Sequence, residues 1–96
     1  LTSKLIMQVV CKFFNIKVSD IVSDKRSNSV AFPRQIAMYL CRELANMSFP
    51  NIGKDFGGRD HSTVLHAYSK IKDEYENNPE TKDLIDDIKK ALSIAD

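Results

Sequence analysis

The sequence predicts an all-α fold, a small bundle of helices that forms one domain over residues 1–96. Apolar residues recur three and four positions apart in every long segment, and no stretch alternates apolar and polar residues as a half-buried strand does. Gly57-Gly58 and Asn78-Pro79 interrupt this pattern and mark turns between helices. A chain of 96 residues that is 43% hydrophobic and 28% charged has the composition of a small globular domain.

The first segment is expected to be a helix that begins after Thr2 or Ser3 and ends at about Asn15. Its apolar stripe at helical spacing consists of Leu5, Ile6, Val9, Val10, Phe13 and Phe14. Such a stripe usually packs against a core. A helix that lies on a membrane surface is the alternative, because Lys4 and Lys12 fall outside the apolar face.

A basic loop is predicted over residues 24–31, after a short helical turn at Ser19-Asp20 that directs Ile21 and Val22 into the core. The loop is polar and lacks apolar periodicity. In a nucleic-acid-binding protein, exposed cations such as Lys25-Arg26 on a loop can reach a phosphate or a narrow minor groove.

A long helix is expected to begin near Phe32, with Pro33 in its first turn, where the missing N–H of a proline does no harm. Its buried stripe is formed by Ile36, Ala37, Leu40, Cys41 and Leu44. Arg34 and Gln35 point from the N-terminal end of this helix, and Arg42 lies further along it.

The chain divides into a basic part and an acidic part. Residues 1–72 carry 11 Lys and Arg against 5 Asp and Glu, a net charge of +6, whereas residues 73–96 carry 3 against 8, a net charge of −5. The acidic part contains a final helix, about residues 80–94, whose inward-facing residues are Leu84, Ile85, Ile88 and Leu92. The basic part can meet a polyanion, whereas the acidic helix is expected to be a solvated face.

Residues 49–76 have the organisation of a helix-turn-helix. Ser48 is expected to cap a short helix, and Gly57 to follow its last residue in a left-handed conformation. After this tight turn, Asp60 is expected to cap a second, longer helix by accepting hydrogen bonds from free N–H groups of its first turn.

The second helix of this motif has two unlike faces. One sector carries the polar residues Arg59, Ser62, Thr63, His66 and Lys70. The opposite sector carries the apolar residues Val64, Leu65, Tyr68, Ile71 and Tyr75. A helix that presents short hydrogen-bonding side chains from its N-terminal end suits a DNA major groove. An ordinary amphipathic surface helix would show the same periodicity.

Residue spacing argues against metal and nucleotide sites. His61 and His66 lie five positions apart and would project roughly 140° apart on a helix, so they do not form a chelating pair. Gly57-Gly58 lacks the Lys-Ser/Thr that completes a phosphate-binding P-loop. We therefore expect no catalytic residue, no metal site and no cofactor in this chain, and no enzyme activity.

The two cysteines, Cys11 and Cys41, lie within apolar helical patterns and are expected to be reduced core thiols. No apolar run is long enough to span a membrane, and no signal-peptide pattern is present. The chain begins at Leu1, which suggests a piece of a longer cytosolic protein.

Two blocks of sequence carry a resemblance to a known family. One reads Phe56-Gly57-Gly58-Arg59-Asp60-His61-Ser62-Thr63-Val64-Leu65-His66-Ala67, and the other, upstream, contains Lys25-Arg26-Ser27, Ser29-Val30-Ala31 and Pro33-Arg34-Gln35. Over nearly its whole length the chain resembles the C-terminal DNA-binding domain, domain IV, of the bacterial chromosomal replication initiator DnaA. The resemblance implies sequence-specific binding of double-stranded DNA at the DnaA boxes of the replication origin.

The resemblance also implies roles for individual residues. Arg26 corresponds to a position that enters the minor groove, and Asp60, His61 and Ser62 correspond to positions that read base edges in the major groove. Positions that lie along the DNA, largely on backbone phosphates, are matched by Arg34, Gln35, Arg42, Phe49, Pro50, Arg59, Thr63 and His66. Three residues depart from common members of the family: Ser62 replaces a frequent threonine, and Asn28 and Phe32 stand where some members carry arginine.

Several of these residues also have a purely structural interpretation. Asp60 can act as a helix cap alone, and His66 can be a surface histidine without a partner. Phe49 can fasten the short helix to the core, and Arg42 can pair with a nearby carboxylate.

The family further implies partners beyond this chain. ATP or ADP would bind a separate AAA+ domain that precedes it, and acidic phospholipids and other replication proteins are described as partners. A helical module that docks on a protein or an acidic phospholipid surface is therefore the alternative to a DNA-binding domain. The isolated domain is expected to be monomeric, and the protein to act at the nucleoid in the cytoplasm.

Overall fold

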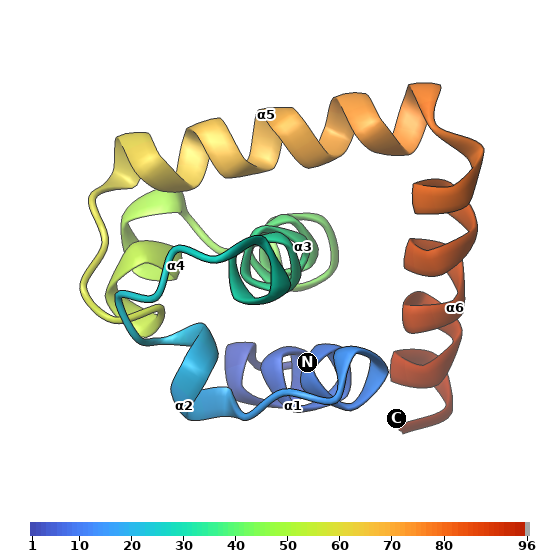
Figure 1. The fold of residues 1–96 in the computed structure, drawn as a ribbon, viewed down its shortest axis with the longest axis horizontal. Helices are drawn as coiled ribbons and strands as arrows, with labels where there is room; N and C mark the ends of the chain where they lie inside the picture. The colour runs from blue at the N-terminus through green and yellow to red at the C-terminus, as the bar shows by residue number, and fades with distance from the viewer. Residues whose placement is uncertain (96) are drawn as a thin grey trace.

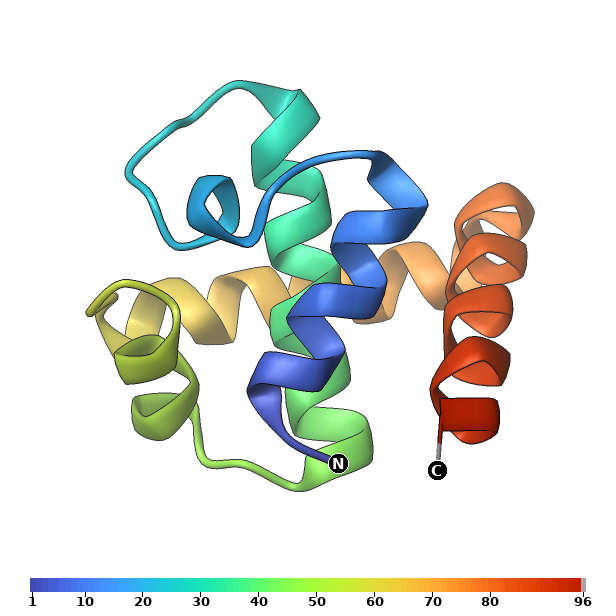
Figure 2. The ribbon, with the colours of Figure 1, turned by 90° about the horizontal axis from the view of Figure 1, so that it is seen from below.

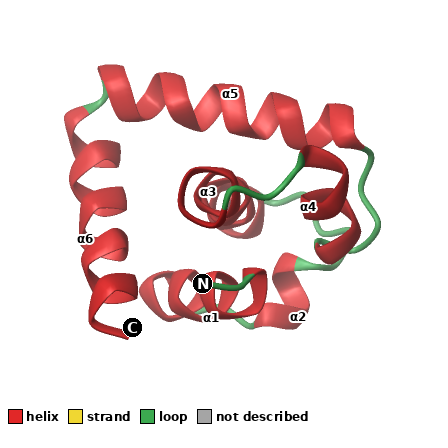
Figure 3. Ribbon diagram, turned by 180° about the vertical axis from the view of Figure 1, so that it is seen from behind, coloured by secondary structure: helices red, strands yellow, loops and turns green. Residues whose placement is uncertain are grey.

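Helix α3 (Asn28–Ala45) runs through the middle of the molecule, and helices α1, α5 and α6 surround it on three sides (Figure 1). The computed structural model describes the backbone of residues 1–95 and the side chains of residues 1–93. Its elements are, in chain order, α1 (Ser3–Phe14), α2 (Val18–Ile21), α3, α4 (Phe49–Asp55), α5 (His61–Asn77) and α6 (Pro79–Ala95). These residues form only helices and loops (Figure 3), which confirms the predicted all-α bundle. Among them, no helix is both long and apolar enough to cross a membrane.

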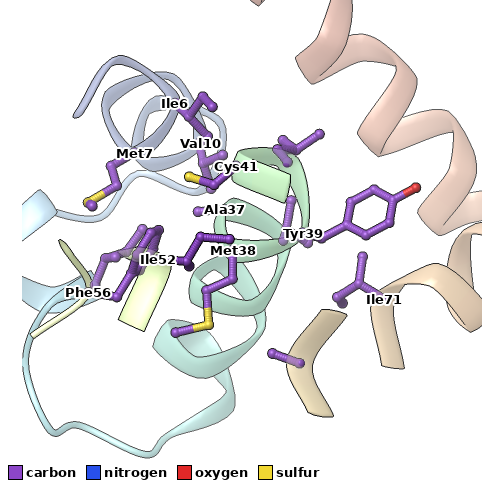
Figure 4. Close-up of a cluster of buried hydrophobic side chains, with 14 of the residues drawn as sticks. Ile6, Met7, Val10, Ala37, Met38, Tyr39, Cys41, Ile52, Phe56 and Ile71 are labelled. Carbon is purple, nitrogen blue, oxygen red and sulfur yellow. The ribbon is translucent and has the colours of Figure 1, made fainter. Parts of the chain in front are cut away.

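Helix α3 is buried on most of its surface because it packs between α1 on one side and α5 on the other. Its fully buried hydrophobic residues include Ile36, Ala37, Met38, Tyr39, Leu40 and Cys41. Figure 4 shows residues of α1, α4 and α5 gathered around this helix, among them Ile6, Ile52 and Ile71. Four residues of the predicted stripe are buried and the fifth, Leu44, is half-buried. Met38 and Tyr39 join the stripe because α3 contacts neighbours on more than one face.

Helix α1 has a different buried face from the one predicted. Ile6 and Val10 are fully buried as expected, but Phe13 is 42% exposed. Met7 and Cys11 are buried instead of Phe13, so the buried face of the helix is rotated about the helix axis towards these two residues. A view along another axis shows α1 crossing over α3 (Figure 2), and this crossing decides which residues turn inward.

Helix α3 begins earlier than the sequence suggested. Its N-cap is Ser27 and its first residue is Asn28, so the predicted start near Phe32 and the predicted loop over 24–31 were wrong by about one turn. Pro33 lies inside the helix as a result. Its missing N–H removes only a bond to the carbonyl of exposed Ser29, where water can replace it. The connecting loop between α2 and α3 therefore comprises residues 22–27.

The turn between α4 and α5 is tight and depends on glycine. Gly57 and Gly58 have φ angles of +84° and +77°, which confirms a left-handed residue after α4. A Cβ atom on Gly57 would lie 2.3 Å from the carbonyl oxygen of Val22, so this turn touches the backbone of the 22–27 loop. Ser48 caps α4 as expected, because its hydroxyl accepts from the N–H of Asn51 at 3.3 Å.

Helix α6 closes the bundle against the C-terminal half of α5 and part of α1. Ile85, Ile88 and Leu92 are buried as predicted, and Leu84 is half-buried. The hydroxyl of Tyr75 donates to a carboxylate oxygen of Asp86 at 2.6 Å, which fixes α6 against α5. The acidic helix therefore lies at the opposite end of α5 from the glycine turn (Figure 1).

Substitution of the two turn glycines separates backbone strain from steric contact. Gly58→Ala should cost about 1–2 kcal/mol, because alanine is strained at positive φ but nothing lies within 4 Å of its Cβ. Gly57→Ala should cost about 1–3 kcal/mol more, because its Cβ also meets the Val22 carbonyl. Thermal unfolding of both variants measures the difference, and equal unfolding midpoints would contradict the close approach to Val22.

The two thiols should resist labelling in the folded protein. Burial raises the pKa of Cys41 to about 12 and also raises that of Cys11. At pH 8 the reactive thiolate of Cys41 would then be present in about one molecule in ten thousand. A thiol reagent should label fully buried Cys41 only at the rate at which the domain opens, and immediate labelling of Cys41 without denaturant would show that the core around α3 does not pack as described.

Candidate nucleic-acid interface

The N-terminal half of helix α5 presents a polar face to solvent. Val64 and Ile71 are fully buried against the core and Ala67 nearly so, whereas Ser62 and His66 are exposed. The split into a buried apolar back and an exposed polar front is thus present in the fold. The apolar sector is narrower than predicted, because Leu65 at its edge is 42% exposed and Tyr68 and Tyr75 are half-buried.

The first residues of α5 carry free hydrogen-bonding groups. Asp60 occupies the N-cap position, but its side chain makes no capping hydrogen bond, so this part of the prediction was wrong. Its carboxylate instead lies 3.3 Å from Nδ1 of His61, and the side chains of Asp60 and His61 are 68% and 63% exposed. Ser62 and Thr63 follow, both exposed. The helix therefore begins with acceptors and hydroxyls that a DNA base edge could contact.

Arg42 and Phe49 form a contact at the other side of the motif. The guanidinium of Arg42 lies 4.7 Å from the centre of the Phe49 ring and donates to the carbonyl of Met47 at 3.0 Å. The Phe49 ring packs 5.6 Å from the ring of Tyr68, which fastens α4 to α5. Phe49 is therefore a packing residue with one edge in solvent, and Arg42 pairs with a carbonyl and a ring instead of a carboxylate.

Pro50 and Gln35 lie on the two helices that pack beside the first half of α5, namely α4 and α3. Pro50 is exposed in the first turn of α4, and Gln35 is half-buried on α3. The side-chain oxygen of Gln35 accepts from Nζ of Lys70 at 3.0 Å. By its spacing Lys70 falls on the polar face of α5, although it matches none of the positions for which the family resemblance implies a DNA contact. Its bond to Gln35 joins this face of α5 to α3.

Arg34, which the sequence predicts to point from the N-terminal end of α3, is almost entirely buried. It is only 7% exposed, because its guanidinium turns inward beneath the 22–27 loop. Nε donates to the carbonyl of Ile21 at 2.6 Å and Nη1 to that of Lys25 at 2.9 Å. Nη2 donates to the carbonyls of Asp20 and Ser23 at 3.1 and 3.0 Å. Sequence reasoning could not find this role, because the partners are backbone atoms.

Arg59 is half-buried and lies next to Arg34. Its guanidinium donates to the carbonyls of Phe56 and Ser23, so it bridges the glycine turn and the 22–27 loop. Burial lowers the pKa of Arg59, and burial together with the charge of Arg59 lowers the pKa of Arg34. Both side chains remain cations, because the pKa of an arginine lies far above neutral pH.

Two adjoining hollows connect these elements into one concave surface. The first, of about 490 Å³, lies at the 22–27 loop and is lined by Val22, Ser23, Asp24, Arg26, Arg34, Gly57, Arg59 and Thr63. The second, of about 290 Å³, lies between α3 and α5 and is lined by Ala31, Arg34, Gln35, Met38, Arg59, Thr63, His66, Ala67 and Lys70. We call this surface the basic groove, since its charged lining residues are cationic apart from Asp24.

Arg26 lies at the loop end of the basic groove. It is exposed, and among the described residues no carboxylate forms an ion pair with it. Its neighbour Lys25 is held instead, because Nζ of Lys25 lies 2.7 Å from a carboxylate oxygen of Asp20. Of the two cations in this loop, Arg26 is therefore the one that has no ion-pair partner among the described residues.

The basic groove thus has Arg26 at its loop end and His66 and Lys70 at its other end, and the exposed first residues of α5 lie outside its lining. Within the described residues there is no group of His, Cys, Asp and Glu side chains that could hold a metal ion. This arrangement suits a negatively charged, extended ligand that is contacted along its length, as duplex DNA is.

Comparison with known proteins also indicates a DNA-binding domain. Residues 3–71 match the family described as bacterial dnaA protein helix-turn-helix. The fold is similar to a crystal structure described as that of a DNA replication initiation factor, with a TM-score of 0.83 and 35% sequence identity. The likeness covers 93% of this chain and 27% of the other, so this chain spans about a quarter of that protein's length. The match over residues 3–71 and the shared fold show that the chain belongs to the helix-turn-helix, DNA-binding family of bacterial DnaA proteins.

Proposed function

We propose that this domain binds duplex DNA sequence-specifically at the DnaA boxes of a bacterial replication origin, and so takes part in the initiation and regulation of chromosomal replication. The observation that carries the proposal is the start of α5. Asp60, His61 and Ser62 stand exposed there, while Val64 and Ile71 fix the opposite side of the helix in the core. A helix held in this way can enter a major groove without losing its packing.

Each exposed group at this position has a suitable partner on a base. The exposed carboxylate of Asp60 can accept from the N4 amino group of a cytosine. His61 can pack on a thymine methyl, and Ser62 can hydrogen-bond a base. Arg26, at the loop end of the basic groove, would enter the adjacent minor groove of the DNA, where the narrow walls concentrate negative potential.

The phosphates between these two places would meet the basic groove. Arg59, Lys70 and His66 line it, together with the hydroxyl of Thr63 and the amide of Gln35. Arg42, Phe49 and Pro50 would contact the DNA on the α4 side. The acidic α6 lies beyond the far end of α5 (Figure 1), so repulsion by the phosphates would keep DNA on the basic side.

Binding should depend steeply on salt. If about six phosphates are neutralised, the logarithm of the affinity should fall with the logarithm of salt concentration with a slope of about −5. A titration of a labelled duplex at several salt concentrations measures the slope. A DnaA-box duplex should bind more tightly than a scrambled duplex of equal length, and equal affinity for both would refute sequence-specific recognition.

Arg26→Ala and Asp60→Ala should each reduce the preference for the box over the scrambled duplex by about 1–3 kcal/mol, because each removes a base contact. Lys70→Ala is the matched control: loss of one phosphate contact should weaken both duplexes alike and reduce the salt slope by about 1. Full discrimination in both Arg26→Ala and Asp60→Ala would show that these residues do not read bases.

A second proposal concerns a membrane surface. The outer side of α1 exposes Phe13, and Leu5, Val9, Ile16 and Val18 line a hollow of about 740 Å³ together with Lys12. This pattern of apolar and cationic groups favours docking on acidic phospholipids. Co-sedimentation of the wild type and of Phe13→Ser with vesicles of acidic and of neutral lipids tests this proposal. Equal binding of the wild type to both kinds of vesicle would contradict it.

In this proposal the isolated domain is a monomer, and the intact protein acts at the nucleoid in the cytoplasm. The 27% coverage of the similar replication initiation factor is compatible with further domains in the intact protein. ATP or ADP would bind in one of those, in an AAA+ domain. Other replication proteins are partners that the intact protein would recruit.

A further inference from the structure

Arg34 is a buried cation whose hydrogen-bond partners all belong to one short segment. Its guanidinium donates to the carbonyls of Ile21, Lys25, Asp20 and Ser23, which enclose the beginning of the 22–27 loop. A guanidinium has five N–H groups in a rigid plane, so four fixed acceptors define the position of the segment relative to α3. With 7% of its surface exposed, Arg34 has little area left for a DNA phosphate.

The carbonyl of Ser23 is shared between two arginines. Nη2 of Arg34 donates to it from α3, and Nη2 of Arg59 donates to it from the turn that precedes α5. A carbonyl oxygen has two lone pairs and can accept both bonds. The two cations repel each other, but the nearby carboxylate of Asp24 acts on both in the opposite sense.

A second, independent contact joins the same two segments. The hydrogen-sized space at Gly57 allows its backbone to approach the carbonyl of Val22, where a Cβ would lie at 2.3 Å. The 22–27 loop is therefore attached to the glycine turn at two successive residues, Val22 and Ser23. Arg26 follows three residues later, and Asp60 directly follows Arg59.

We propose that Arg34 and Arg59 together fix the distance between Arg26 and Asp60, with Arg34 acting as a positioning residue and not as a DNA contact. The inference rests on the proposed function, in which Arg26 reads the minor groove and the start of α5 reads the major groove. When Arg26 and the start of α5 are held at a fixed spacing, they can enter the two DNA grooves at the same time. The entropy cost of ordering the loop is then incurred on folding and not on DNA binding.

Lysine at these positions separates geometry from charge. Arg34→Lys keeps the positive charge, but an ammonium group has three donors at one point and does not span four carbonyls. Arg59→Lys retains the bonds of Arg34 and removes only the guanidinium bridge from the turn to Ser23. This second variant, at a half-buried position, keeps the test valid if Arg34→Lys does not fold.

The decisive experiment is a double-substitution cycle with a DnaA-box duplex. A·T pairs of the box are exchanged for G·C one at a time, which locates the pairs that Arg26 senses in the wild type. Arg26→Ala should lower discrimination at those pairs by about 5- to 150-fold. Arg34→Lys should cause a similar loss of discrimination at the same base pairs. The double variant should lose less than about 2-fold more discrimination than either single variant, because both changes act through the side chain of Arg26.

Lys70→Ala provides the matched comparison, because Lys70 lies in the basic groove but not on the loop. Combined with Arg26→Ala, its effect should be additive. If the effects of Arg34→Lys and Arg26→Ala are also additive, and Arg34→Lys weakens all duplexes alike, then Arg34 acts through its own phosphate contact or through general stability, and the proposal is wrong.

Hydrogen exchange of the free protein tests the attachment without DNA. In Arg34→Lys and in Arg59→Lys, the hydrogen-bonded amides of Ser23 and Lys25 should exchange faster, while those of α3 and the core of α5 keep their wild-type rates. Faster exchange throughout the domain would mean global destabilisation, and unchanged exchange at Ser23 and Lys25 would mean that the arginines do not hold the loop. If the wild type fails to discriminate the box, the proposed function fails, and this measurement still decides whether the attachment exists.

Discussion

The burial of helix α3 is the constraint on which the rest of the structure depends. A central helix that is apolar on most of its surface must be covered on several sides, and α1 and α5 provide the largest part of that cover. Covering α3 requires the apolar side of α5, with Val64 and Ile71, to turn inward. The polar side of α5 is thereby turned outward, so the surface proposed to read DNA is a consequence of how the core is formed.

The cations of the basic part of the chain have two distinct roles. Arg34, Arg59 and Arg42 are hydrogen-bonded to backbone carbonyls of loops and helix ends. Arg26 remains exposed in the 22–27 loop, whose carbonyls accept hydrogen bonds from Arg34 and Arg59. A basic composition therefore does not give the number of phosphate contacts, because some of the arginines are hydrogen-bonded within the protein. Their charge still contributes to the positive potential of the groove.

Glycine has a specific function in this arrangement. The turn between α4 and α5 requires positive φ at two successive residues, and one of them also leaves space for the carbonyl of Val22. The same turn carries Arg59, whose guanidinium reaches Ser23. The close packing of the turn against the 22–27 loop thus depends on Gly57, which has no side chain, and on Arg59, two residues later, whose long side chain reaches Ser23.

Local sequence patterns determined the helical class, the glycine turn, the cap at Ser48 and the split faces of α5, because these depend on spacing and on backbone conformation within a few residues. They also carried the family resemblance through residues 56–67 and 25–35. Tertiary structure alone decided the rotation of α1, which exposes Phe13, and the burial of Arg34. These features depend on backbone carbonyls and neighbouring helices that are distant in the chain, and no periodicity within one segment contains that information.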